Sequence, residues 1–238
     1  MNRLIACACL FALLISMGGC KHEQATSTIC LLDVSKSIDP NSIRDEFAAM
    51  DRLVDRMHRG DRLILIPITG NARNDVQGHI VRLVAPDRRA AFDSDLTAFR
   101  KQAHEEIGRM KDWASSHPGD RTDILGTLQI AQQEIASEPQ ANARLVILSD
   151  FIEDDGRWSF AKDQSLASAA SARRLADTIA MQRNGPLRDI PMYLGRLKSR
   201  DRAALSASRL DAIDAFWKEL LGNQRQSKSI HADGAGSL

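Results

Sequence analysis

Cysteine is scarce in this chain, and its few positions exclude several kinds of site. The 238 residues contain four cysteines, and Cys7 and Cys9 fall in an apolar N-terminal run that we expect to be removed. Beyond Cys20, the only thiol is that of Cys30. A lone thiol excludes an intramolecular disulfide framework and leaves no cysteine pair for zinc. Because Cys30 lies within the apolar run 29–32, it is predicted to be a small core residue.

Aromatic residues and net charge are also low. Only 5% of the residues are aromatic, and the formal net charge at pH 7 is +1. So few aromatic rings argue against the base-stacking platforms of RNA-binding proteins. A nearly neutral chain has no electrostatic attraction to nucleic acid or to an anionic surface. The composition therefore predicts a globular protein without a nucleic-acid partner.

The chain has no apolar run long enough to span a membrane as a helix. The longest covers residues 4–17, follows Arg3 and precedes a Gly-Gly-Cys sequence that ends at Cys20. This layout is typical of a secretory signal peptide. Small residues before a cysteine are similar to the bacterial lipobox, which implies cleavage before Cys20 and its lipidation, although Met17 stands where leucine is usual. An ordinary signal peptide with a chance cysteine, or an uncleaved anchor, is the alternative.

The lipoprotein interpretation sets the expected domain division and location. Residues 1–19 are the expected signal peptide, and residues 20–27 the lipidated cysteine and a polar tether. Residues 28–222 are the expected folded domain. The tail 223–238 is expected to be disordered, because it is polar and poor in core-forming residues. We expect a bacterial cell-envelope protein, lipid-anchored to the inner or outer membrane, with its domain in the periplasm or at the cell surface.

Strand-like and helix-like patterns alternate through the expected domain. Continuous apolar runs indicate strands that are buried on both faces, and apolar residues three and four apart indicate amphipathic helices. The expected strands are 28–34, 61–70, 78–86, 144–149 and 190–197, and the expected helices are 40–58, 93–115, 122–137, 166–183 and 210–221. This alternation predicts an α/β fold with a mostly parallel sheet covered by helices on both faces, and 78–86 is a candidate edge strand.

Oxygen-bearing side chains follow two of the expected strands. Asp33, Ser35 and Ser37 come after the first strand at every second position, Asp150 ends a later strand, and Thr122 begins a helix. Because ligand sites in such folds lie beyond the carboxyl ends of the strands, we expect these side chains to meet. Two carboxylates and three hydroxyls suit Mg²⁺, Mn²⁺ or Ca²⁺ rather than zinc or copper. Helix capping is the alternative explanation for the serines.

This set of residues resembles the von Willebrand factor A (VWA) domain and its metal-ion-dependent adhesion site (MIDAS). The pattern is Asp33-x-Ser35-x-Ser37 after "ICLL", Thr122 in "RTDILGTL" and Asp150 at the end of "LVILSD". The resemblance implies a doubly wound fold with one antiparallel edge strand and a metal beyond the strand ends. It also implies that Ser35 and Ser37 bind the ion directly, and the other three residues directly or through water.

The same resemblance implies a function in binding. A carboxylate from a protein partner often completes the metal shell in these domains, which are seldom enzymes. After Asp150 the family commonly has glycine, but here Phe151 adds bulk beside the expected site. Glu153 and Asp154 are candidate rim residues that would shield the metal or repel an acidic partner. The alternative for residues 153–155 is a solvated acidic loop.

We therefore expect a lipid-anchored extracytoplasmic module that binds a protein through a divalent metal. One alternative is a structural lipoprotein in which the metal only stabilises the fold. A magnesium-dependent hydrolase with Asp33 as nucleophile is disfavoured, because phosphatases of the haloacid dehalogenase type need an acid two residues later, where Ser35 stands. The chain also contains neither a G-x-S-x-G elbow nor a P-loop.

Overall fold

The computed structural model describes residues 25–88, 93–138, 142–182 and 190–222. The predicted signal peptide, Cys20 and the predicted tail lie outside these ranges. Thr26 and Ser27 were expected in the tether, but they begin the first strand, because Ser27 pairs with Arg62 of the neighbouring strand. Within the described ranges, no helix has both the length and the apolar character needed to cross a membrane.

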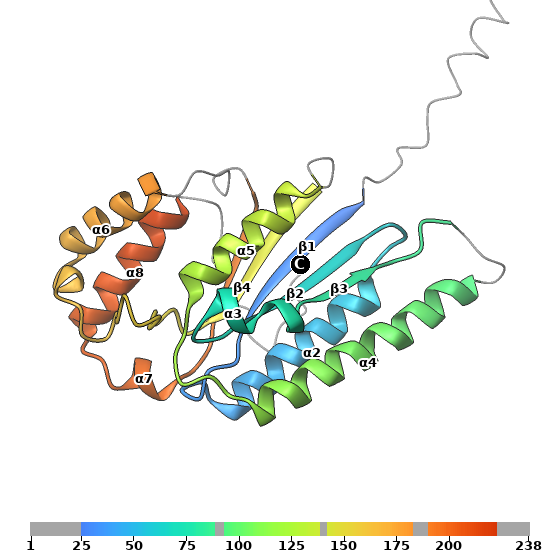
Figure 1. Cartoon of the computed structure of the whole chain (residues 1–238), viewed down its shortest axis with the longest axis horizontal. Coiled ribbons are helices and arrows are strands. Elements are labelled where there is room, and N and C mark those ends of the chain that lie inside the picture. The colour runs from blue at the N-terminus through green and yellow to red at the C-terminus, as the bar shows by residue number, and fades with distance from the viewer. Residues whose placement is uncertain (1–24, 89–92, 139–141, 183–189, 223–238) are drawn as a thin grey trace, which may run out of the picture.

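Five strands form one sheet in the order β3-β2-β1-β4-β5 (Figure 1). They are β1 (Thr26–Asp33), β2 (Arg62–Ile68), β3 (Val81–Val84), β4 (Asn142–Ser149) and β5 (Met192–Arg196). All neighbouring strands pair in parallel except β3, which runs antiparallel to β2 at the edge of the sheet. The predicted fold class, with its single antiparallel edge strand, is therefore confirmed for the described residues.

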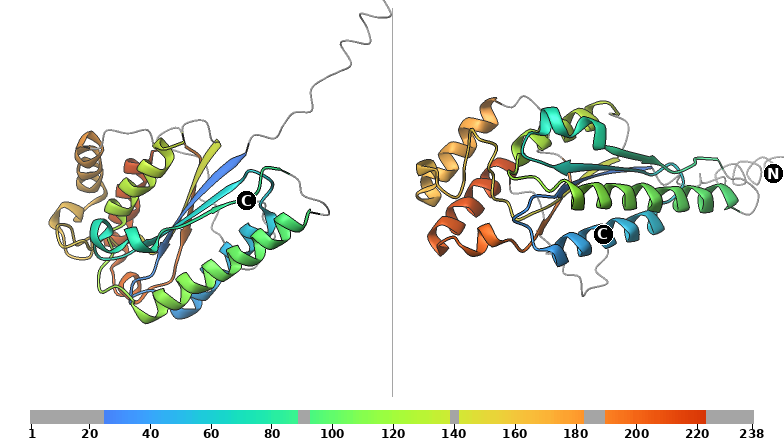
Figure 2. Two further views of the ribbon diagram at one scale, coloured as in Figure 1. Left: turned by 45° about the vertical axis from the view of Figure 1, so that its right-hand side comes forward. Right: turned by 60° about the horizontal axis from the view of Figure 1, so that its bottom comes forward.

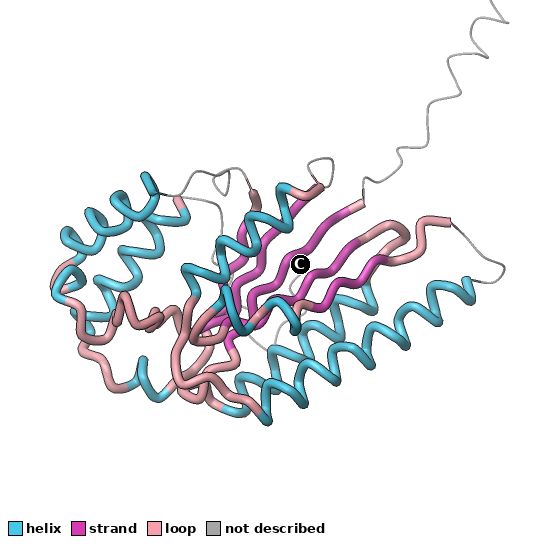
Figure 3. Tube along the Cα trace, in the orientation of Figure 1, coloured by secondary structure: helices cyan, strands magenta, loops and turns pink. Residues whose placement is uncertain are grey.

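Helices cover both faces of this sheet. The long ones are α2 (Pro40–Arg56), α4 (Ser94–Ser116), α5 (Ile124–Ala136), α6 (Ala169–Gln182) and α8 (Ala207–Leu221). The short segments are α3 (Ala72–Asp75), η1 (Gln77–His79), η3 (Gln164–Leu166) and α7 (Arg200–Ala203), which the sequence patterns did not predict. Figures 2 and 3 show α2 and α4 on one side of the sheet and α5 on the other.

The buried residues form two layers because side chains alternate along the strands. In β1, Ile29 and Leu31 belong to the cluster that includes residues of α5, α6 and α8. Cys30 and Leu32 belong to the opposite cluster, with residues of α2 and α4. Cys30 is a free, fully buried thiol, and its burial raises its pKa to about 12. It therefore packs as predicted, since a thiol with so high a pKa is unreactive.

The centre of the sheet is its topological switch point. From β1 the chain proceeds to β2 and β3 on one side, and then crosses back to β4 and β5 on the other. Leu32 pairs with both Pro67 of β2 and Leu148 of β4. In open α/β sheets, ligands bind beyond the carboxyl ends of the strands at such a point. The residues that follow β1 and β4 therefore occupy the expected position of a site.

Candidate functional site

Asp33 is the last residue of β1, and its carboxylate lies wholly in the interior, with 0% of the residue exposed. Its Oδ1 accepts a hydrogen bond of 3.1 Å from the backbone N–H of Ser35. Its Oδ2 accepts one of 2.6 Å from the hydroxyl of Ser149, the last residue of β4. These two bonds hold the first turn after β1 against the end of the adjacent strand.

Ser35 and Ser37 face one another in the loop between β1 and α2. Their Oγ atoms are 3.1 Å apart. The loop is held on one side by Lys36 N–H, which donates to Gly119 O at 2.9 Å, and on the other by Ser37 O, which accepts from Arg200 N at 2.9 Å.

Helix capping does not explain these two serines. The cap of α2 is Asp39, whose Oδ1 accepts from the N–H groups of Asn41 and Ser42 at 2.9 and 3.3 Å. Pro40 occupies the first helical position, as the sequence predicted. The hydroxyls of Ser35 and Ser37 are therefore not used by this helix end.

Thr122 lies just before α5 rather than within it. It forms a two-way backbone bridge with Asp154, with N–H to O distances of 3.1 and 2.8 Å. Asp123 is the residue that caps α5, and its Oδ1 accepts from Gly126 N at 2.6 Å. The expectation that Thr122 begins the helix was therefore wrong by two positions, since α5 begins at Ile124. The bridge leaves Thr122 beside the β1–α2 loop.

Asp150 follows β4 and is almost completely buried. Its Oδ1 accepts from Ile152 N at 2.8 Å, and Arg202 Nη1 donates to its backbone carbonyl at 3.0 Å. The Ser199 hydroxyl is near enough to lower its pKa, but Oδ2 makes no hydrogen bond within the described part of the chain. A buried carboxylate oxygen without a donor is costly, so the structure leaves one oxygen of Asp150 available for a ligand.

The surroundings of both carboxylates disfavour the ionised form. Burial raises the pKa of Asp33 to about 7, with the negative charge of Asp150 as the next cause. Burial is also the largest cause of the raised pKa of Asp150. Two buried acids at adjacent strand ends are stable as carboxylates only beside positive charge. The donor set consists of hard oxygens, so these residues fit a divalent ion such as Mg²⁺, Mn²⁺ or Ca²⁺.

A pocket of about 270 Å³ opens over these residues. Ser35, Ser37 and Thr122 all line it, so the structure brings these three predicted ligands to one surface. We call this the strand-end pocket. Asp33 lies beneath it, hydrogen-bonded to Ser35, and Asp150 is close enough to Asp33 to raise its pKa.

The three candidate rim residues have different positions. Asp154 lines the strand-end pocket. Phe151 does not, because its backbone has a positive φ of 63° and its ring is buried against Trp217, with centroids 5.8 Å apart. Glu153 is not solvated either: it is fully buried, and its Oε2 accepts from Ile124 N and Leu125 N, both at 3.0 Å. Its carboxylate therefore stabilises the N-terminus of α5.

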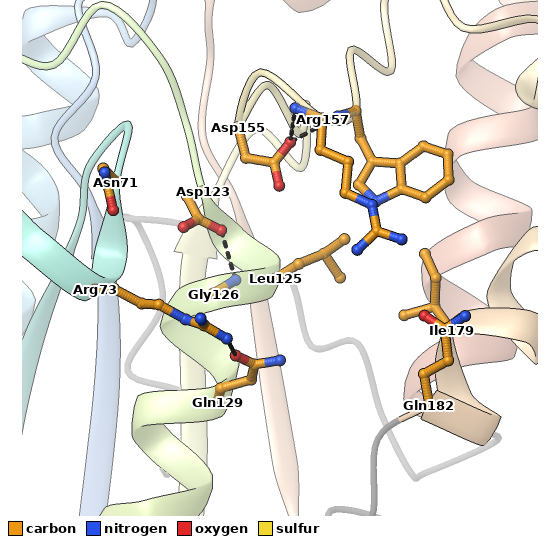
Figure 4. Close-up of a pocket in the computed structure, with 11 residues that line it drawn as sticks. Asn71, Arg73, Asp123, Leu125, Gly126, Gln129, Asp155, Arg157, Ile179 and Gln182 are labelled. Carbon is orange, nitrogen blue, oxygen red and sulfur yellow. Dashed lines mark hydrogen bonds between the residues drawn. The ribbon is translucent and has the colours of Figure 1, made fainter.

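A second acidic group lies on the other side of Thr122. One carboxylate oxygen from each of Asp123, Glu153 and Asp155 lies within 4.8 Å of the others, a spacing that permits a metal ion. Asp123 and Asp155 line a separate pocket of about 380 Å³ between α5 and α6 (Figure 4). Asp155 accepts from Arg157 N and Trp158 N at 2.8 and 2.6 Å. Because each carboxylate already accepts backbone N–H groups, helix capping and turn formation account for the cluster.

Two residues beside the site were not predicted. Ser149 has a signal in the sequence, since it directly precedes Asp150 at a strand end. Glu46 has none, because an acid within an amphipathic helix reads as a solvent-facing residue. In the structure Glu46 is buried, and its pKa is raised well above the usual range by burial, then by the charge of Asp33.

No protein-family profile matches this chain, and no curated protein matches it. A von Willebrand factor type A structure from Catenulispora acidiphila is 16% identical with a TM-score of 0.43, over 83% of this chain and 43% of that chain. Manganese-loaded Plasmodium vivax TRAP protein is 12% identical with a TM-score of 0.44, over 87% of this chain and 66% of that chain. The three N-terminal domains of the type V pili tip protein Mfa5 from Porphyromonas gingivalis are 15% identical with a TM-score of 0.39, over 68% of this chain and 28% of that chain.

This chain thus spans less than two thirds of each of these three chains. The fold itself is established by the sheet. The doubly wound sheet, with its antiparallel edge strand β3, is the arrangement that the resemblance implied. The described residues therefore have a von Willebrand factor A-like fold.

Proposed function

We propose that this protein is a lipid-anchored module of the bacterial cell envelope that binds a protein partner through a divalent metal ion. Asp33, Ser35, Ser37, Thr122 and Asp150 would hold the ion, which is Mg²⁺ or, in its place, Mn²⁺ or Ca²⁺. When bound, it supplies a Lewis-acidic position for a carboxylate of the partner. The lipid on Cys20 would hold the module at the inner or outer membrane.

One observation carries this proposal. The carboxylates of Asp33 and Asp150 are buried at adjacent strand ends, and burial disfavours the ionised form of each. Asp150 Oδ2 has no donor within the described residues. A fold gains nothing from such a pair unless a cation accompanies it. The neutral hydroxyls of Ser35, Ser37 and Thr122 add oxygens without adding negative charge, so two carboxylates balance one divalent ion.

The position of the site relative to the chain supports a role in binding. β1 begins at Thr26, where the tether would enter, and ends at Asp33, where the site begins. At about 3.3 Å per residue, these two ends are roughly 25 Å apart. An anchor at Cys20 would therefore hold the strand-end pocket on the side of the domain away from the membrane, where a partner can reach it.

Two other functions remain as alternatives. In a structural lipoprotein the ion would only stabilise the fold, and the strand-end pocket would have no occupant. A hydrolase that used Asp33 as nucleophile would need that carboxylate to be accessible, but it is buried and accepts hydrogen bonds from Ser35 and Ser149. The pocket that Ser35, Ser37 and Thr122 line favours a binding module.

The test is crosslinking in the native host. We expect a crosslinked partner that is lost with chelator and in Asp33→Asn, and that is retained in Asp155→Asn, which changes an acid of the second cluster. Capture of the same partner with and without chelator would favour the structural alternative. Phosphatase turnover that disappears in Asp33→Asn would instead support the hydrolase.

A further inference from the structure

Arg121 lies at the boundary of two pockets. It directly precedes Thr122 and lines the strand-end pocket. It also lines a wider pocket whose wall includes Trp113, and Asp120 is the other residue that both share. A partner peptide that extends from the wider pocket into the strand-end pocket would therefore pass the Arg121 side chain.

Two glycines from distant loops make room for Arg121. A Cβ atom built on Gly70 would lie 2.9 Å from Arg121 Cβ, closer than real Cβ contacts allow. A Cβ built on Gly156 would collide with Arg121 Nη1, and the φ of +88° at Gly156 also favours glycine. In the structure, the guanidinium therefore lies beside Gly156 in the loop after β4.

The charge of Arg121 is not neutralised by a partner. Its guanidinium is exposed and forms no hydrogen bond or ion pair with any residue that the structure describes. The other cations of the strand-end pocket differ. Lys36 pairs with Asp120 at 2.5 Å, and Arg200 donates to the backbone carbonyl of Lys36 at 2.8 Å. The charge of Arg200 is not neutralised by that bond, but one of its donors is already used. Among the described residues, Arg121 is the cation of this rim whose side chain makes neither a hydrogen bond nor an ion pair.

We propose that Arg121 binds a second acidic side chain of the partner, next to the carboxylate that reaches the metal. The inference rests on the proposed function. The expected partner surface is an acidic peptide segment in which two carboxylates lie close together. A guanidinium offers paired N–H donors that match both oxygens of a carboxylate, so it recognises this group better than it does a neutral amide.

The remaining rim charges restrict where the second carboxylate can lie. Asp154 and Asp201 also line the strand-end pocket and carry the opposite charge. They repel an acidic side chain on their own sides, and Asp120 is compensated by Lys36. A second acidic residue is therefore favoured beside Arg121 and disfavoured beside Asp154 and Asp201. Arg200, the other cation of this rim, is adjacent to Asp201 and already donates to the Lys36 carbonyl.

The test begins with a phage-displayed library of random peptides, panned against the full-length chain in detergent with Mg²⁺ and eluted with chelator. We expect wild-type protein to select peptides with two acidic residues close together, and Arg121→Gln to select peptides with one. The control is Arg73→Gln, which removes the same charge from the separate pocket shown in Figure 4. This variant should select peptides with two acidic residues, as wild type does. The magnesium-dependent rise in melting temperature should be the same in all three proteins.

A double-mutant cycle then separates direct contact from a structural role. A selected peptide is synthesised with both acids, and with either one replaced by its amide. Arg121→Gln should weaken the two-acid peptide by about 1.5- to 5-fold, as expected for an exposed ion pair. It should not weaken the version that lacks the second acid. Equal weakening of both versions would overturn the inference, because Arg121 would then only support the loop.

The failure of this inference can be told from the failure of the proposed function. Magnesium-dependent peptides that carry a single acid and bind Arg121→Gln as tightly as wild type would overturn the role of Arg121 and leave metal-dependent binding intact. Peptide selection that is indifferent to chelator, or no selection at all, would overturn both.

Discussion

The hydroxyl of Ser149 donates a hydrogen bond of 2.6 Å to Oδ2 of Asp33, and this bond joins the ends of the two central strands. The same hydroxyl accepts from Phe151 N at 3.0 Å, so it also fixes the turn after β4. This bond and the Ser35 N–H favour the Asp33 carboxylate, whereas burial and the charge of Asp150 raise its pKa to about 7. The protein without metal thus holds a carboxylate pair that a cation would stabilise.

The first prediction concerns the isosteric variant Asp33→Asn. Its amide can still accept from Ser35 N and can donate to the Ser149 hydroxyl, so we expect the metal-free fold to be kept. Wild type should gain about 2.7 kcal/mol of stability when free Mg²⁺ is a hundred times its Kd. This corresponds to a rise in Tm of roughly 5–10 °C for a domain of this size. Asp33→Asn should show no rise, as measured by tryptophan fluorescence during heating of the full-length chain in detergent.

The matched control distinguishes the two acidic groups. Asp155→Asn alters the cluster of Asp123, Glu153 and Asp155 and should retain the whole magnesium effect. If Asp155→Asn lost the rise in Tm and Asp33→Asn kept it, the ion would bind at the second cluster. If neither wild type nor the variants responded to Mg²⁺, Mn²⁺ or Ca²⁺, the metal site itself would be wrong.

The sequence predicted the elements, and it identified the five candidate oxygen ligands, because both depend on local pattern. Continuous apolar runs mark central strands, and an alternating Asp-x-Ser-x-Ser after such a run places polar groups at a strand end. The doubly wound arrangement and the antiparallel edge strand were implied by the resemblance. Each of these signals lies within a few residues of the feature that it predicts.

The environment of the site depends on distant contacts and could not be predicted in this way. Glu153 was expected in solvent, but it is buried because the loop after β4 lies over the N-terminus of α5. The position of Arg121 depends on Gly70 and Gly156, which come from two other loops. The inward rotation of Phe151 depends on Trp217 in the last helix. None of these pairings is encoded by sequence spacing.

The second prediction concerns the left-handed backbone at Phe151, where φ is 63°. Phe151→Ala should cost about 3–5 kcal/mol through the loss of its buried ring. Phe151→Gly should cost about 1 kcal/mol less than Phe151→Ala, because glycine adopts a positive φ without strain. The free energy of unfolding from urea titrations of the two variants measures this difference.

Phe160 provides the control for that comparison. It is fully buried and packs edge-on against Phe216, with centroids 4.6 Å apart, but its φ is not positive. There the glycine variant should be less stable than the alanine variant, since glycine loses more backbone entropy on folding. If glycine were also the worse choice at position 151, the backbone conformation there would not be left-handed in solution.

The third prediction is a pH dependence at the contact between α2 and α4. His104 Nδ1 lies 2.8 Å from Asp51 Oδ1, and Nε2 lies 3.0 Å from Asp55 Oδ1. The hydrogen bond to Asp51, followed by that to Asp55, raises the pKa of His104. A pKa raised above the unfolded value of about 6.5 gives stability that is fully present below that pH. This stability is lost as the pH rises through the folded pKa.

The measurement compares wild type with His104→Gln in urea titrations from about pH 5.5, below the ordinary pKa of histidine, to about pH 9, well above it. We expect the wild-type advantage to be largest at the acidic end and to shrink at the alkaline end. A constant difference for His104→Gln would show that its imidazole is not charged in this contact.

The last prediction concerns Glu46, which lies in α2 on the face that covers the sheet. Neither carboxyl oxygen makes a hydrogen bond within the described residues, although the backbone of Asp33 is near enough to lower the pKa. A buried polar group without a partner costs about 1–3 kcal/mol. Glu46→Leu keeps a similar volume without the polar atoms, so we expect the metal-free protein to become more stable by roughly 1–2 kcal/mol.

Glu46→Gln is the matched control, because it keeps the shape and the polar atoms and removes the acid. It should fall between wild type and Glu46→Leu in urea titrations with chelator present. Both variants should retain the magnesium-dependent rise in Tm, since none of the five predicted ligands is changed. Glu46→Leu could instead be less stable than wild type, or could lose the response to magnesium. Either result would show that the carboxyl group of Glu46 stabilises the end of β1 and does not destabilise the core.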